Sequence, residues 1–213
     1  MRLSCSRRRR VPTASYWLVA ALALPGCAVV GAVAHKVVGP PTQAARYKPR
    51  PGDPMLVLVE NGSNPSANLI DAQRLSARLA DELGRRQVVP IVPPEKLDAQ
   101  RDRDLGGFPN RSVAGVGRSV GAKQVLYVNL HTFGIETAGP TGRGRAEARV
   151  KIVDAETGET RWPTDQADGY IVADQTPTTQ LDQSHTVQAL QDNLYQRMSD
   201  QIARLFFDYK PED

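Results

Sequence analysis

The sequence predicts an α/β protein of the α+β type, a single domain in which helices pack on a mixed β-sheet. Two observations predict this class. Apolar runs of strand length alternate with segments whose apolar residues recur every three or four positions, as on one face of a helix. Clusters of Gly, Pro, Asn and Asp separate these segments and mark turns. We expect the domain to span residues 55–213, with the element order β-α-β-α-β-β-β-α.

The first strand and the first helix follow from hydrophobic pattern and capping residues. The run MLVLVE from Met55 has the length of a strand, and the NGSNPS that follows is rich in turn residues. Ser66 is a candidate N-cap and Gly84 a candidate stop for the next helix. The apolar residues of this helix are Leu69, Ala72, Leu75, Leu79 and Leu83.

The middle of the chain predicts a second strand and two short helices. QVVPIV has the composition of a strand, and Pro90 restricts it to an edge or a bulge. PPEKLDAQRDRD begins with prolines, which suit the first turn of a helix. A further short helix is expected over residues 112–120, ending at Gly121.

The last third of the chain predicts a long strand, a hairpin, another strand and a closing helix. AKQVLYVNLHTFGIE is the long strand, and RAEARVKIVDAETGETRW is the hairpin, with Gly158 at a turn position that needs a positive φ. GPTGRGR between them is expected to be a loop, and residues 169–173 a strand. The closing helix is expected from about His185 to Phe207. Its apolar stripe comprises Val187, Leu190, Leu194, Met198, Ile202, Leu205 and Phe206.

Residues 1–26 have the layout of a secretory signal peptide. A basic block at residues 7–10 precedes a short apolar run at residues 16–24, and the chain then turns at Pro25. The run is shorter than the ~20 apolar residues that a lasting membrane-spanning helix needs. The segment LPGC, which ends at Cys27, resembles the lipobox of bacterial lipoproteins.

The lipobox resemblance implies a lipid anchor. In that family the chain is cleaved before the cysteine, whose sulfur and amine are acylated, so cleavage is expected between Gly26 and Cys27. Two or three acyl chains such as palmitate hold a protein on a membrane stably, because each buried methylene contributes about 0.8 kcal/mol. The residue after the cysteine is Ala28 rather than Asp, which in this family favours the outer membrane. We therefore expect membrane lipid as a partner through Cys27, with the domain facing the periplasm.

The charge of the chain changes when the signal peptide is removed. The whole chain has 27 Lys+Arg and 23 Asp+Glu, and five of the arginines but no acid lie in residues 1–27, which leaves 22 basic against 23 acidic residues. Nucleic acid is therefore not an expected partner, because the basic balance belongs to the signal peptide. Residues 27–54, which begin with the lipidated cysteine and are rich in proline, are expected to form a tether.

Two stretches of the predicted domain resemble known envelope families. GRSVGAKQVLYVNL and ARVKIVDAETGETRW are similar to segments of the curli-secretion channel lipoprotein, the amino-terminal domain of the Tol translocation protein and lipoprotein activators of penicillin-binding proteins. The similarity covers roughly residues 55–175, and Asn129 replaces a glycine of the third strand. It implies an envelope protein or the peptidoglycan machinery as partner. A secretion pore is not expected, because GIETAGPTGRGR is too short and polar for its membrane hairpin.

The sequence predicts no catalytic residue, no metal ligand set and no cofactor. His35, His131 and His185 lie on separate segments and lack metal-ligand spacing. The glycine-rich segments lack the Lys-Ser/Thr of a phosphate loop, and the sequence has no Gly-x-Ser-x-Gly elbow. DAETGE misses the spacing of a calcium loop.

Three classes of function remain. The expected one is a non-enzymatic interaction and assembly module, anchored to the outer membrane. The alternative is a periplasmic binder of a small ligand or glycan, which would need a pocket lined by aromatic residues; Trp162 is the only tryptophan after the signal peptide. The third, a hydrolase, would need a cluster of a base, an acid and a nucleophile, for example around His131.

Overall fold

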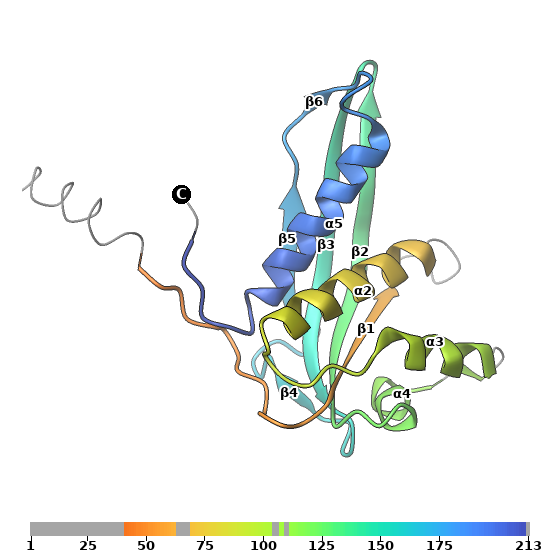
Figure 1. Cartoon of the computed structure of the whole chain (residues 1–213), viewed down its shortest axis with the longest axis vertical. Coiled ribbons are helices and arrows are strands. Elements are labelled where there is room, and N and C mark those ends of the chain that lie inside the picture. Colours follow the sequence, from red (N-terminus) through yellow and green to blue (C-terminus); the bar gives the residue numbers. More distant parts are fainter. Residues whose placement is uncertain (1–40, 63–68, 104–106, 109–110, 212–213) are drawn as a thin grey trace, which may run out of the picture. The chain divides into compact units, whose positions relative to one another are not determined.

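The structure, a computed structural model, describes residues 41–62, 69–103, 107–108 and 111–211 (Figure 1). The predicted signal peptide, the cleavage site at Gly26 and Cys27, and the predicted N-cap Ser66 lie outside these residues. Residues 43–209 form one compact unit, and the description below concerns this unit. Within the described residues, no helix is both long enough and apolar enough to cross a membrane.

Within the residues that the structure describes, six strands form one mixed sheet. In chain order they are β1 (Met55–Asn61), β2 (Gln124–Ala138), β3 (Thr141–Asp154), β4 (Thr160–Trp162), β5 (Tyr170–Gln175) and β6 (Thr179–Gln180). Strand β1 pairs with β2 in parallel, whereas all the other pairs are antiparallel. Strand β3 is central, because β2 lies on one side of it and β4, β5 and β6 pair with successive parts of its other side.

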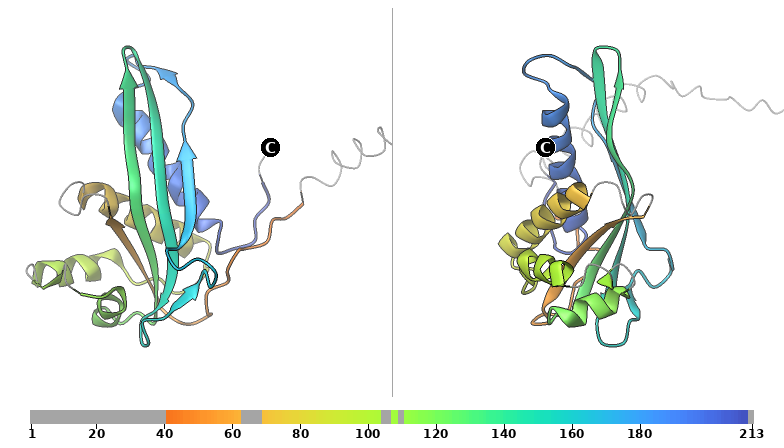
Figure 2. Two further views of the ribbon diagram at one scale, coloured as in Figure 1. Left: turned by 180° about the vertical axis from the view of Figure 1, so that it is seen from behind. Right: turned by 90° about the vertical axis from the view of Figure 1, so that its right-hand side faces the viewer.

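Four helices pack on this sheet, so the predicted fold class is confirmed. They are α2 (Leu69–Arg85), α3 (Pro94–Arg103), α4 (Val113–Ser119) and α5 (Val187–Ala203). Figure 2 shows α2 and α5 on the same side of the sheet. The main core lies between them and the sheet. A smaller core on the opposite face joins α4 and Leu97 of α3 to alternate residues of β1, such as Leu56 and Leu58.

The long hairpin β2–β3 corrects the predicted loop GPTGRGR. The turn is confined to Gly139, whose φ is +56°, and Pro140, so residues 141–145 already belong to β3. Glycines in this part of the strand make room for packing. A Cβ on Gly142 would lie 3.0 Å from side-chain atoms of both Leu181 and Leu190. The glycines therefore bring the chain after β6 and helix α5 close to the sheet.

Two predicted boundaries in the first half are also wrong. QVVPIV forms only one isolated bridge, in which the N–H of Met55 donates to the carbonyl of Pro90 and the N–H of Val92 donates to the carbonyl of Met55, both at 2.8 Å. The ladder stops there because Pro90 and Pro94, whose backbone nitrogens have the alternation that faces β1, have no N–H to donate. Helix α2 continues past Gly84, and it ends where Gln87 takes the left-handed conformation with φ +52°.

The closing helix is shorter than predicted. Helix α5 begins after Thr186, whose hydroxyl accepts the N–H of Ala189 at 3.1 Å, and it ends at Ala203. Thr186 is therefore the N-cap of α5. Most of the predicted stripe is buried, but Val187 is 45% exposed.

The compact unit starts at Gln43, before the expected end of the tether at residue 54. The N–H groups of Gln43 and Tyr209 each donate to the other residue's carbonyl, at 2.7 and 2.9 Å. Lys48 pairs with Asp208 at 2.8 Å, and the ring of Tyr47 stacks on Trp162 with centroids 6.1 Å apart. Residues 43–48 therefore run beside the chain after α5 and pack on the domain.

Candidate interaction surface

The turn between β3 and β4, within the motif VDAETGETRW, is built by its own residues. The carboxylate of Asp154 accepts the N–H groups of Glu156 and Thr157, at 2.8 and 3.1 Å. The N–H of Gly158 donates to the Asp154 carbonyl at 2.9 Å, and Gly158 has a φ of +81°. The predicted turn is therefore confirmed. The hydrogen bond from the Thr157 N–H is the largest influence that holds the pKa of Asp154 below its usual range.

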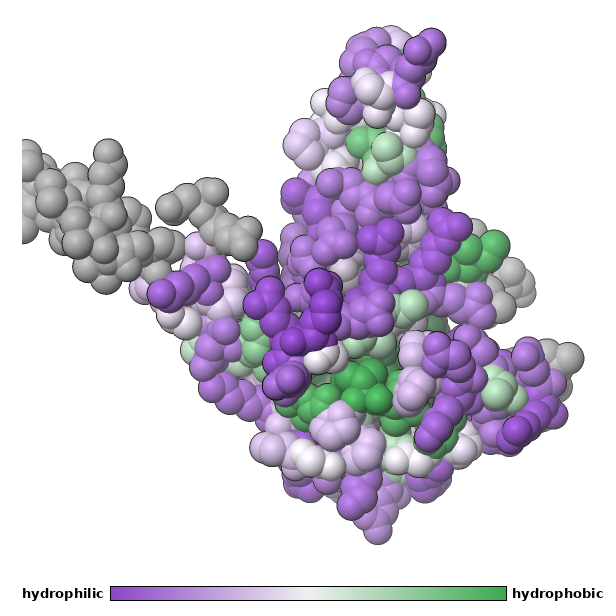
Figure 3. Space-filling model, viewed as in Figure 1, coloured by the Kyte–Doolittle hydropathy of each residue, from purple (hydrophilic) through white to green (hydrophobic). Residues whose placement is uncertain are grey.

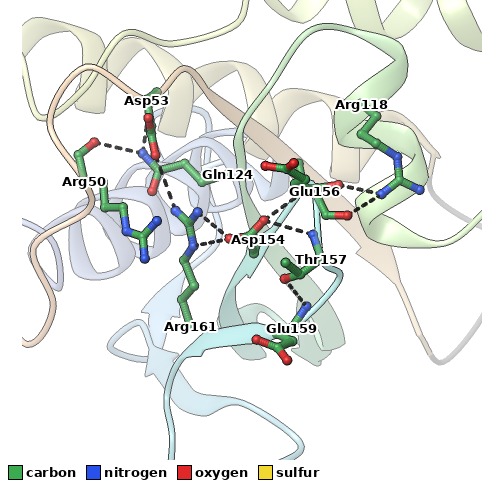
Figure 4. A network of polar contacts seen from close by, with 10 residues as sticks. Arg50, Asp53, Arg118, Gln124, Asp154, Glu156, Thr157, Glu159 and Arg161 are labelled. Carbon is green, nitrogen blue, oxygen red and sulfur yellow. Dashed lines mark hydrogen bonds and ion pairs between the residues drawn. The ribbon is translucent and has the colours of Figure 1, made fainter.

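A network of charges continues from this turn to two other segments (Figure 4). The Arg161 guanidinium donates from Nε to Asp154 at 2.9 Å and lies 3.6 Å from Asp53. The side-chain amide of Gln124 donates to the carbonyls of Asp53 and Arg50, at 2.9 and 3.2 Å. The network therefore fixes the segment before β1, the start of β2 and the β3–β4 turn to one another.

Helix α4 holds the same turn from the other side. Arg118 donates to the carbonyls of Ala155 and Glu156, at 2.7 and 3.1 Å. A Cβ on Gly117 would lie 2.5 Å from Val125, so only glycine lets this helix approach the sheet so closely. The motif that the sequence analysis selected therefore stabilises the fold, and its charges are paired within the domain.

Asn129, which replaces the glycine of the resembling families, lies on β2 against Gly62. A Cβ on Gly62 would collide with the side-chain amide of Asn129. The larger residue on β2 is thus accommodated by a glycine after β1.

A Ser, a His and an Asp are in contact in the structure, but around His185 and not around His131, the residue that the hydrolase alternative named. His131 is the extra residue of a β-bulge in β2 and is exposed. In the loop before α5, both the Ser184 hydroxyl and the Asp182 carboxylate contact Nδ1 of His185, at 3.1 and 3.2 Å. A catalytic triad needs the acid and the nucleophile on opposite ring nitrogens.

The Asp182 carboxylate serves as a local cap. It accepts the Ser184 hydroxyl and the backbone N–H groups of Ser184 and His185, and these bonds lower the pKa of Asp182. The loop is exposed, so this cluster orders the approach to α5 rather than enclosing a substrate.

The aromatic residues do not form a sugar-binding platform around Trp162. Its ring lies 5.3 Å from that of Tyr170 and 5.8 Å from that of Phe206, and both rings belong to or pack against the main core. Among the described residues, no group of three or more His, Cys, Asp or Glu could hold a metal ion. A hollow of about 310 Å³ does lie beside β5, and two of its lining residues are Tyr170 and Tyr209.

The surface that Figure 3 shows is mostly hydrophilic. In this view a hydrophobic area lies over the connection between α2 and α3. Val88 and Ile91 of this connection are half-buried and pack against the main core, so the area is an edge of that core. On β3, Arg143 pairs with Glu136 at 2.8 Å and Arg149 with Asp168 at 3.2 Å.

Fold and site together define a single α+β domain in which the charged motif holds the fold. The chain belongs to the family of peptidoglycan-synthase activators LpoB, whose family model matches residues 28–167. This confirms the predicted resemblance to lipoprotein activators of penicillin-binding proteins. No curated protein matches the sequence.

Solved structures of bacterial proteins, two of them described as lipoproteins, are similar at low identity. Lipoprotein GNA1162 from Neisseria meningitidis is 15% identical, with 72% of this chain and 99% of that chain covered and a TM-score of 0.45. The PelC dodecamer from Paraburkholderia phytofirmans is 14% identical, with 81% and 97% covered and a TM-score of 0.39. A putative lipoprotein from Caulobacter crescentus is 15% identical, with 70% and 82% covered and a TM-score of 0.36.

The sequence analysis missed the residues that join the two ends of the compact unit. Tyr47, Lys48 and Asp208 lie in segments without periodicity, and their pairing spans most of the chain. It also missed the buried link between α2 and α5, in which the Tyr195 hydroxyl and the Gln191 amide donate to Asp71. One signal was available for this link: Asp71 is a charged residue in the first turn of a helix whose other face is apolar.

Proposed function

We propose that this chain is an outer-membrane lipoprotein that faces the periplasm and activates a peptidoglycan synthase by binding it, without catalysing a reaction itself. The observation that carries the proposal is the family match, which begins at residue 28, directly after the lipobox cysteine Cys27. The lipid would hold the domain at the membrane, and the domain would contact the synthase.

The geometry of the described residues supports a binding role over catalysis. The charged motif around Asp154 and Arg161 is engaged in holding the fold, and the Asp182–Ser184–His185 cluster lacks the arrangement of a triad. Trp162 is partly buried and packs against the main core, which argues against a glycan-binding platform around its ring.

Activation is tested with the full lipoprotein in detergent and a purified synthase from the same cell. We expect the initial rate of glycan-chain polymerisation to rise with lipoprotein concentration and to saturate, because binding is the cause. The lipoprotein alone should release no product from lipid-linked precursor or from finished peptidoglycan. An unchanged synthase rate at saturating lipoprotein, or hydrolysis by the lipoprotein alone, would overturn the proposal.

Anchoring is tested with the Cys27→Ala variant and, as a matched control, Cys5→Ala, which removes the other cysteine from within the signal peptide. We expect Cys27→Ala to incorporate no radioactive palmitate and to leave the membrane fraction during a carbonate wash, because the acyl chains supply the membrane affinity. Cys5→Ala should be labelled and retained like the wild type, in the outer-membrane band of a density gradient. Equal retention of Cys27→Ala would contradict the lipid anchor.

A further inference from the structure

In the part of the chain that the structure describes, strand β5 has one free edge. It pairs there with β3 on one side only, and the N–H of Thr176 donates to the carbonyl of Gly144 at 3.0 Å in the same register. Because backbone groups alternate in direction along an antiparallel strand, Tyr170, Val172 and Asp174 turn theirs toward β3. The N–H and C=O groups of Ile171 and Ala173 therefore point away from the sheet, where they can pair with another strand.

A groove follows this free edge. The hollow of about 310 Å³ has β5 as one wall, with Ile171 and Ala173 among its lining residues. The facing wall is the pair of segments that Gln43 and Tyr209 join by two backbone hydrogen bonds. The side chain of Ile171, which is 51% exposed, offers an apolar contact beside the edge.

The groove is positively charged. Arg46 and Arg204 line it, together with Gln43 and Gln201, and none of its described lining residues is Asp or Glu. The Arg204 guanidinium lies 5.0 Å from the centre of the Tyr209 ring, which holds it at the groove wall. A carboxylate in the groove would therefore meet guanidinium donors, which bind carboxylates in a fixed geometry.

The edge strand is held rigidly before any partner binds. Arg197 of α5 donates two hydrogen bonds to Asp174 of β5, at 2.7 and 2.8 Å, and the Asp174 side chain is only 6% exposed. Burial raises the pKa of Asp174, but the bonds from Arg197 and from the Gln175 N–H outweigh burial and lower it. The pair therefore stays ionised and fixes β5 to α5, so that little order is lost when a strand is added.

We propose that the β5 edge binds an extended acidic segment of a partner protein, which adds a strand to the sheet and places a Glu or Asp side chain between Arg46 and Arg204. Main-chain hydrogen bonds to Ile171 and Ala173 supply the pairing, and the two arginines select the charge. A second copy of this chain is a poor occupant, because two-fold pairing of the same edges would bring the same arginines together. The inference rests on the edge geometry and goes beyond the activation proposed above.

The binding test uses the purified full chain in detergent and two fluorescent hexapeptides, one of alternating Val and Glu and one of alternating Val and Lys. We expect the Glu peptide to bind about tenfold more tightly or better, because the groove is basic. Arg46→Glu and Arg204→Glu should reverse this preference, whereas Arg103→Glu, the same charge change on exposed α3, should not. Equal affinity for both peptides in the wild type would overturn the proposal.

Strand addition is tested on both partners. The Ala173→Pro variant removes one outward N–H without removing a bond to β3, and proline is tolerated on edge strands, so the variant should fold but bind the Glu peptide at least about tenfold more weakly. Two N-methylated versions of the Glu peptide are compared, one methylated on the odd residues and one on the even residues. One version should lose binding and the other should keep it, because only alternate amides face β5.

Equal affinities of the two N-methylated peptides would overturn strand addition even if Ala173→Pro did not fold. Self-association of the wild type that Ala173→Pro abolishes, measured by sedimentation, would assign the edge to a second copy and also overturn the proposal.

Discussion

The Leu194→Asp variant should lose the cooperative unfolding transition of the domain. Leu194 lies in the middle of α5, has no exposed surface and packs in the main core between α5 and the sheet. An ionised carboxylate at this place would be buried without a partner, which costs several kcal/mol. A domain of this size is stable by only about 5–15 kcal/mol, so the loss is comparable with the whole stability.

The matched control is Asn193→Asp, which introduces the same carboxylate at the neighbouring, exposed position of the same helix. Circular dichroism at 222 nm during heating should show a wild-type transition for Asn193→Asp and a broad or absent one for Leu194→Asp. An unchanged melting temperature for Leu194→Asp would mean that α5 does not pack on the sheet in solution.

Helix α5 was predictable because its packing obeys one period. Residues at a spacing of three and four fall on one side of a helix, and the members of the stripe from Leu190 to Ile202 are all buried in α5, whereas Leu205 and Phe206 are buried after the helix ends. Val187 is the exception, since it lies in the first turn. Strand β3 was predicted for a similar reason: Ala148, Val150 and Ile152 alternate with charged residues and face the main core.

The glycine-rich stretch GPTGRGR, most of which lies in β3, was misread because glycine has two physical uses. It permits a positive φ in turns, which is true of Gly139, and it also permits close packing, which is true of Gly142 and Gly144. Sequence alone does not separate these uses. The separation requires knowing that α5 and the residues after β6 lie on this part of the hairpin.

The groove beside β5 could not be predicted for a different reason. Its walls come from both ends of the compact unit, at residues 43–46 and 201–209, and from an edge strand near the middle of the second half. Proline-rich composition predicted a tether over residues 27–54 but said nothing about the surface on which residues 43–48 pack. By contrast, the turn at Asp154 was predictable, because the hydrogen bonds that the Asp154 carboxylate accepts from Glu156 and Thr157 are local.

The Arg161→Met variant should be less stable than the wild type by about 2–3 kcal/mol near neutral pH, because a hydrogen-bonded charge loses its partner. The side chains of Arg161 and Asp154 are 12% and 14% exposed, so water replaces the lost guanidinium only in part. Methionine keeps much of the aliphatic volume, so the change isolates the charge. Urea unfolding, followed by tryptophan fluorescence, measures the difference.

The difference in free energy of unfolding between the wild type and Arg161→Met should depend on pH in a defined direction. The pKa of Asp154 is lowered in the folded domain by the N–H of Thr157, and by Arg161 among the further contributors. A group with a lowered pKa stabilises the fold above its unfolded value of about 3.9, and this contribution is lost as the pH falls through the folded value. The gap between wild type and Arg161→Met should therefore be widest at about pH 6–7 and close below about pH 4.

Two controls make the result specific to this ion pair. Arg103→Met removes an exposed arginine from α3 and should leave the free energy of unfolding within about 0.5 kcal/mol of the wild type. In the Asp154→Asn background, Arg161→Met should cost less than in the wild type, and the difference is the coupling energy of the pair. Equal costs in both backgrounds would mean that Arg161 acts through Asp53 or through packing on its neighbours, because the charge of Asp154 would then make no contribution to its effect.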